Sequence, residues 1–139
     1  MLRMRREVHG ASVSKQSPTS RALQQLRKDG WLPAVVEKWN PGARVRQDLF
    51  GFIDIVAIPG VYQTTLGICG IQVTTAAHMA ERFTKIASPP VLDKARAWLQ
   101  AGNQVEIWGY AKRGPRGQRK VWTLTRRAVT LRDLEGGGA

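Results

Sequence analysis

The chain has 139 residues and carries 22 lysines and arginines against 10 acidic residues, which gives a formal net charge of +12. This length fits a single domain with its own core, and the charge favours nucleic acid as a partner over a basic surface kept only for solubility. The one cysteine, Cys69, excludes an internal disulfide and a cysteine-based metal site, and we expect it in the core. Because no run of about 18 apolar residues occurs, we expect a soluble, cytoplasmic protein without a membrane segment.

The first predicted segments are a basic arm and a helix. Residues 1–17 lack hydrophobic periodicity, which predicts a flexible arm that either follows a phosphate backbone or has no role. A helix is expected to begin after Ser17, which can cap it, with Pro18 at its first position. Two leucines give this helix an apolar face, and Gly30 is expected to end it.

Three strands are predicted next. The first covers residues 31–39 and is followed by a turn at residues 40–42. An extended segment over residues 44–49 alternates charged with uncharged residues, so its charged side should face outward. The second and third strands cover residues 52–58 and 66–74, and the short loop between them predicts an antiparallel hairpin.

Each strand of this hairpin contains one conspicuous polar residue in an apolar run, Asp54 in the first strand and Gln72 in the second. Burying an ionised carboxylate costs several kcal/mol unless it is paired or bound to a metal, so Asp54 is the leading functional candidate. If the hairpin is centred near residues 62–63, Asp54 lies opposite Gln72, and Thr74 shares their face. The three polar groups then converge, and a slip of one residue would separate them.

Two helices are predicted after the hairpin. The first, over residues 76–88, turns an apolar face inward and presents Arg82 and Lys85 on its other side. The second, over residues 91–101, begins after a pair of prolines and ends before Gly102.

The last predicted elements are two strands, over residues 104–112 and 120–126. The loop between them is rich in glycine and basic residues, which either contact phosphates or only prevent aggregation. Trp98 on the preceding helix and Trp122 on the last strand occupy core-like positions.

This order of elements predicts an α/β fold, a single domain over residues 18–134 with a central mixed sheet flanked by helices, followed by a flexible tail at residues 135–139. The sequence has no phosphate-binding glycine loop, no nucleophile elbow and no zinc-protease motif, which excludes several enzyme classes. What remains is a group of acids in a basic protein: Glu37, Asp48 and Asp54. Such carboxylates can bind a divalent cation that acts on a phosphodiester while lysines and arginines hold the polyanion.

The run RQDLFGFIDIVAI, followed after a short hairpin by GIQVTT, resembles the two strands that carry the metal site of PD-(D/E)xK nucleases, and within that superfamily the small Holliday junction resolvases. The resemblance covers residues 19 to about 125. It implies a restriction-endonuclease-like domain in the cytoplasm of a prokaryotic or phage-infected cell. It assigns Asp54 to the metal-binding aspartate, Gln72 to the second acidic position and Thr74 to the position of the lysine.

Gln72 and Thr74 depart from the family pattern. A glutamine, like the backbone carbonyl of Val73, can still ligate a metal but adds no negative charge, and a threonine cannot replace an ammonium group. Three other residues are candidates to compensate: Glu37, Asp48 and Lys38. Glu37 is also the candidate to replace a glutamate that the family often carries on its first helix. For Glu37 and Asp48, the alternative is a surface ion pair.

The resemblance implies a structure-selective DNA endonuclease, a Holliday junction resolvase that acts as a homodimer and hydrolyses phosphodiesters with Mg²⁺ or Mn²⁺. Its catalytic group would comprise Asp54, Glu37, Asp48, Gln72 and Thr74, with the Val73 carbonyl as a further metal ligand. The residues expected to hold DNA phosphates without reading bases are Lys38, Arg44, Arg46, Arg82, Lys85, Lys112, Arg113, Arg116 and Arg119. The alternatives are a nicking or repair nuclease on the same fold and a DNA-binding module without catalysis.

Overall fold

The computed structural model describes residues 16–61 and 63–136. The helices are α2 (Pro18–Lys28), α3 (Met79–Ile86), α4 (Leu92–Gln100) and α5 (Leu131–Gly136), with a short 3₁₀ helix η2 (Ala76–His78). The strands are β1 (Leu32–Val35), β2 (Lys38–Asn40), β3 (Val45–Gln47), β4 (Ile55–Ile58), β5 (Cys69–Thr75), β6 (Gln104–Arg113) and β7 (Val121–Val129). Residues 1–15 of the predicted arm and 137–139 of the predicted tail lie outside the described residues, whereas residues 135–136 belong to α5.

The central sheet has five strands in the order β1-β4-β5-β6-β7. β5 and β6 run parallel, and the other neighbouring strands run antiparallel. The parallel pair needs a crossover connection, which η2, α3 and α4 provide. A separate two-stranded sheet pairs β2 with β3. The protein is therefore a mixed α/β domain built on a mixed sheet, as its order of elements predicts.

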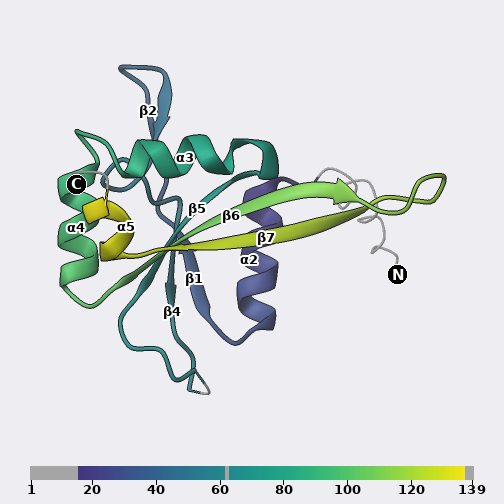
Figure 1. Ribbon diagram of the computed structural model, residues 1–139, viewed down its shortest axis with the longest axis horizontal. Helices are drawn as coiled ribbons and strands as arrows, with labels where there is room; N and C mark the ends of the chain where they lie inside the picture. Colours follow the sequence, from purple (N-terminus) through teal and green to yellow (C-terminus); the bar gives the residue numbers. More distant parts are fainter. Residues whose placement is uncertain (1–15, 62, 137–139) are drawn as a thin grey trace, which may run out of the picture.

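Helices cover both faces of the sheet (Figure 1). On one face, Ala22 and Leu26 of α2 pack against β4, β5 and β6. On the other face, α3, α4 and α5 form a second cluster with Ile107 of β6. Successive side chains of a strand point to opposite faces, so Ile107 belongs to one cluster and the neighbouring Trp108 to the other. Within the described part of the chain, no helix is both long enough and apolar enough to cross a membrane.

The helix ends follow the predicted signals. The Ser17 hydroxyl accepts a hydrogen bond from the Ser20 N–H at 3.1 Å, which caps α2. Gly30, which follows the last turn of that helix, has a φ of +90°, a conformation that glycine adopts without steric cost. Cys69 is buried in the α2 cluster as a free thiol, as expected.

The predicted first strand, over residues 31–39, is wrong in its extent. The chain leaves the central sheet after β1, and β2 forms a hairpin with β3 across the predicted turn at residues 40–42. In that turn, the Asn40 carboxamide oxygen accepts hydrogen bonds from the N–H groups of Gly42 and Ala43. The next two predicted strands are also shorter at their starts, because β4 begins at Ile55 and β5 at Cys69.

The prediction that Trp122 lies in the core is wrong. Its side chain is 44% exposed. β6 and β7 form a long hairpin that extends past α2 and the other helices (Figure 1). Trp122 lies at the start of β7, where Arg21 of α2 stacks over its ring at 4.6 Å. Trp98, in contrast, packs partly buried against the α3 to α5 cluster.

Candidate functional site

The antiparallel register of β4 and β5 brings two polar side chains together. Ile55 pairs with Ile71, the register of a hairpin centred near residues 62–63, and beyond this pair the Asp54 N–H donates to the Ile71 carbonyl at 2.9 Å. The side chains of Asp54 and Gln72 meet, with Oδ2 and Nε2 3.0 Å apart, as the predicted hairpin requires. Both side chains are buried, with exposed fractions of 6% and 3%.

Asp54 is held by direct hydrogen bonds from β5. Its Oδ2 accepts one from the Gln72 side-chain Nε2 at 3.0 Å and one from the Val73 backbone N–H at 2.8 Å. The same Nε2 also donates to Asp48 Oδ2 at 3.1 Å. The Gln72 amide, which is distant in sequence from both carboxylates, thus bridges Asp48 and Asp54.

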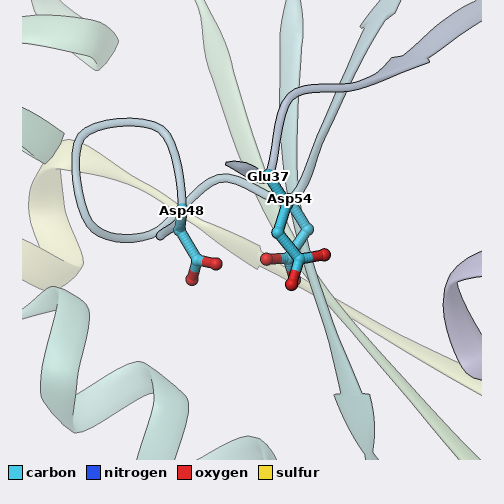
Figure 2. Close-up of side chains that lie close together, drawn as sticks. All are labelled: Glu37, Asp48 and Asp54. Atoms are coloured by element: carbon cyan, nitrogen blue, oxygen red, sulfur yellow. The ribbon is translucent and has the colours of Figure 1, made fainter. Parts of the chain in front are cut away.

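Three carboxylates meet at this point, and Figure 2 shows them turned toward a common region. One oxygen each from Glu37, Asp48 and Asp54 lies within 4.8 Å of the others. Glu37 reaches the site because the Val36 N–H donates to the Asp54 carbonyl at 2.9 Å, which sets the end of β1 beside Asp54. Asp48 follows β3 directly, and its side chain turns toward the cluster. The prediction that the charged side of residues 44–49 faces outward is therefore wrong for Asp48.

The electrostatic environment of Asp54 disfavours its charged form. The pKa of Asp54 is raised from 3.8 to about 7, chiefly by burial and then by the hydrogen bond and negative charge of Asp48 and the charge of Glu37. The Val73 N–H acts in the opposite direction but is outweighed. A shift of this kind at a cluster of carboxylates is typical of functional sites. The positive charge of a bound cation would favour the ionised carboxylate and so oppose this shift.

Basic side chains surround the carboxylates. Lys85 Nζ of α3 lies 3.9 Å from Asp48 Oδ2, and Arg46 Nε lies 3.8 Å from Glu37 Oε2. Arg82, one turn before Lys85, donates from Nε to the hydroxyl of the buried Thr74 at 3.5 Å. A pocket of about 780 Å³ opens between the β2–β3 hairpin and α3, and its lining includes Glu37, Arg46, Asp48, Arg82 and Lys85. An ammonium group is thus present near the site, although it comes from a helix and not from position 74.

The donor set fits a hard divalent cation, which prefers carboxylate and amide oxygens. Gln72 Oε1 is buried and has no hydrogen-bond partner among the described residues. Because the two ends of an amide are nearly the same size, half a turn would bring Oε1 to the position of Nε2, between Asp48 and Asp54. A cation between the carboxylates would favour that orientation.

The remaining predicted site residues are Val73, which contacts Asp54, and basic residues on two hairpins. Val73 contributes its N–H to the site. Lys38 and Arg44 lie on the exposed β2–β3 hairpin, above the pocket. The predicted DNA-contacting residues of the last loop lie on the β6–β7 hairpin, away from the carboxylates: Lys112, Arg113, Arg116 and Arg119. There, Lys112 lies over the Trp122 ring at 5.4 Å, on the face of the sheet that carries α2.

The pocket-lining residues that sequence reasoning missed include an aromatic and a basic side chain, Phe50 and Lys94. Phe50 has a φ of +55°, which is uncommon for a bulky residue. The sequence signal was present, because Phe50 precedes Gly51 in a short segment between two extended runs, where a turn is expected. Lys94 lies on the exposed side of α4, and nothing in its local sequence indicates a site.

Comparison of the chain with protein-family models, with curated proteins and with solved structures gives no match. Any functional conclusion therefore depends on the residues and geometry described above.

Proposed function

We propose that this protein is a divalent-metal-dependent DNA endonuclease of the PD-(D/E)xK type that acts on branched DNA as a junction resolvase. The observation that carries the proposal is the convergence of Glu37, Asp48 and the buried Asp54, with one oxygen of each within 4.8 Å of the others, in a chain with a net charge of +12. Three carboxylates repel each other. Glu37 and Asp48 have basic partners in Arg46 and Lys85, at 3.8 and 3.9 Å, whereas the buried Asp54 makes no ion pair among the described residues. A cation removes the repulsion, and a basic surface supplies affinity for a polyanion.

The residues that would hold Mg²⁺ or Mn²⁺ are the carboxylates of Asp54, Asp48 and Glu37, with the side-chain oxygen of Gln72. When bound, the ion acts as a Lewis acid that polarises the phosphodiester and favours loss of a proton from an attacking water. The chain itself orients these ligands: the Val73 N–H of β5 fixes Asp54, and in the absence of an ion the Gln72 Nε2 bridges Asp48 and Asp54.

Lys85 takes the role that Thr74 cannot perform. Its ammonium group lies 3.9 Å from Asp48 Oδ2, close enough to contact a phosphate that reaches the carboxylates. A positive charge fixed at that point stabilises the negative charge that develops during phosphodiester hydrolysis. Arg82 and Arg46 flank the same pocket and would position the DNA backbone without reading its sequence.

The proposal also specifies the substrate and the oligomeric state: the substrate is branched DNA, and the enzyme is a homodimer. Two basic regions support a substrate that spans more than one duplex. One surrounds the carboxylate pocket, and the other lies on the β6–β7 hairpin, on the opposite side of the sheet. Symmetric cutting of a four-way junction requires two active sites, which a two-fold homodimer supplies.

The test is cleavage of end-labelled four-way junction, nicked duplex and linear duplex DNA in Mg²⁺ or Mn²⁺. We expect paired, symmetric cuts in the junction, loss of cleavage in Asp54→Asn, and a rate about 100-fold lower in Lys85→Gln. Asp93→Asn and Lys28→Gln are matched controls, because they make the same chemical changes at exposed positions outside the pocket. Both should cleave at the wild-type rate.

The other outcomes separate the alternatives. Equal cutting of all three DNAs would reduce the proposal to a general nuclease. DNA binding without cleavage in either metal would identify a DNA-binding module and overturn the enzymatic proposal. Light scattering of the protein with and without junction DNA measures the number of subunits, and a monomer on the cleaved junction would contradict the dimer.

A further inference from the structure

A shallow apolar recess adjoins the carboxylate pocket and shares residues with it. The recess has a volume of about 380 Å³ and is lined by Phe50, Lys94, Ala97, Trp98, Ala101 and Asn103. Phe50 and Lys94 line both the recess and the carboxylate pocket, so the two spaces are adjacent. A DNA strand that places its phosphate at the carboxylates passes close to the recess.

A tight turn holds Phe50 at this boundary. The Gly51 N–H donates to the Asp48 carbonyl at 3.0 Å, and the Ile53 N–H donates to the Leu49 carbonyl at 3.0 Å. Phe52 and Ile53 after the turn are fully buried and anchor it to the core. Phe50 itself adopts a φ of +55°, a conformation in which a bulky side chain costs about 1 kcal/mol or more. The surrounding core thus maintains an aromatic ring in a strained position.

The ring is not used to fill the core. Phe50 remains 48% exposed, and its nearest aromatic neighbour, Trp98, lies at a centroid distance of 6.4 Å with the two rings tilted by 58°. The indole N–H of Trp98 is already engaged, because it donates to the Gln104 carbonyl at 2.7 Å. The recess therefore offers aromatic and methyl surface, with a lysine at its rim.

We propose that this recess binds one unpaired nucleobase next to the phosphate that is cleaved. A nucleobase is a flat ring that stacks on an exposed aromatic side chain, and such stacking tolerates any base. Its backbone carries phosphates, whose charge complements Lys94 at the shared rim and Lys85 and Arg82 in the adjoining pocket. The inference rests on the proposed nuclease function and adds to it a substrate class, DNA that has an unstacked base at the cleavage point. A fully stacked duplex has no free base face for this recess.

The experiment compares two metal-free duplexes that are identical except for one unpaired 2-aminopurine. Affinity is measured by fluorescence anisotropy, and the environment of the unpaired base by 2-aminopurine emission. We expect wild-type protein to prefer the duplex with the unpaired base, and its emission to change on binding. Phe50→Ala should reduce that preference at least about fivefold while leaving affinity for the paired duplex unchanged. Phe50→Tyr should retain the preference.

Trp122→Ala is the matched control, because Trp122 is an aromatic residue of similar exposure on the other face of the sheet. It should leave the ratio of the two affinities unchanged. An equal preference in wild type and Phe50→Ala, or equal binding of both DNAs by wild type, would overturn the inference. Wild-type protein that binds neither DNA would instead overturn the proposed function, so the two failures are distinguishable. Thermal unfolding of each variant separates loss of folding from loss of base binding.

Discussion

Asp54→Asn should stabilise the metal-free protein, and the gain should depend on pH. The folded state raises the pKa of Asp54 from 3.8 to about 7. Between these two values the folded protein keeps a proton that the unfolded chain has lost, so raising the pH favours unfolding. The contribution of Asp54 to stability is therefore fully present below about pH 4 and is lost as the pH rises to about 7. A difference of about three pKa units corresponds to roughly 4 kcal/mol.

An asparagine at position 54 avoids this loss. Its side-chain oxygen can accept the two hydrogen bonds that Gln72 and Val73 now donate to Asp54 Oδ2, and its NH₂ group can donate to Asp48. We therefore expect Asp54→Asn to be more stable than wild type by up to about 4 kcal/mol near pH 8, with a gain that shrinks toward zero as the pH approaches 4. This is a large fraction of the stability of a typical domain.

The assay is urea unfolding in EDTA at several pH values between 4 and 8, with Asp93→Asn as the control for a generic Asp to Asn change. Asp93 is exposed at the start of α4, so its replacement should give no pH-dependent gain. Added Mg²⁺ should stabilise wild type and have little effect on Asp54→Asn, because binding to the folded state alone raises stability. A variant that is less stable than wild type at pH 8, or a gain that is equal at all pH values, would refute the electrostatic reasoning.

Two further substitutions test the site and the sheet. Gln72→Glu adds a fourth carboxylate to the cluster, so calorimetry should show tighter Mg²⁺ binding and urea unfolding should show lower metal-free stability at neutral pH; weaker Mg²⁺ binding would contradict the assigned ligand set. Gly109→Ala should destabilise the protein by about 1–3 kcal/mol in the same unfolding assay, because the added methyl group would overlap Met79 and lie 2.9 Å from the Ala76 Cα. Gly42→Ala, whose methyl group would meet only Asn40 Oδ1 at 3.4 Å, should cost less.

The sequence predicted those parts of the site that depend on residues close together in the chain, through hairpin register and strand alternation. The centre of the β4–β5 hairpin sets the register of its strands, so the sequence predicts that the side chains of Asp54 and Gln72 meet, and they do. The alternation of a strand then places Thr74 on the same face as Gln72. The helix ends at Gly30 and Gly102 were predictable for the same reason, because a positive φ after a helix favours glycine locally.

The errors arise where partners distant in sequence decide the structure. Residues 31–39 read as one continuous strand, and only the pairing of β2 with β3 shows that the chain changes sheets after β1. Trp122 has the alternation of a core residue, but the long side chains of Arg21 and Lys112, and no apolar cluster, lie against its ring, so it stays 44% exposed. Asp48 lies in an alternating charged segment, and its inward direction follows from the Gln72 amide, which is contributed by another strand.

Under the proposed nuclease function, the position of Lys85 explains why a motif read along one strand can underestimate a site. In the family motif, the lysine lies two residues after the second acid. Side chains two residues apart on a strand point to the same face of the sheet, so both reach the site. Chemistry requires only that an ammonium group be fixed near the phosphate, and it does not specify the element that carries it. In this chain, α3 belongs to the crossover between β5 and β6 and covers the face of the sheet that carries Gln72 and Thr74. Lys85 of α3 lies close to Asp48 on that face. Thr74 then no longer needs a charge, and its buried hydroxyl accepts a hydrogen bond from Arg82 on that helix. On this reasoning the departure at Thr74 is a relocation of the positive charge, and Lys85→Gln tests it more directly than restoring a lysine at position 74.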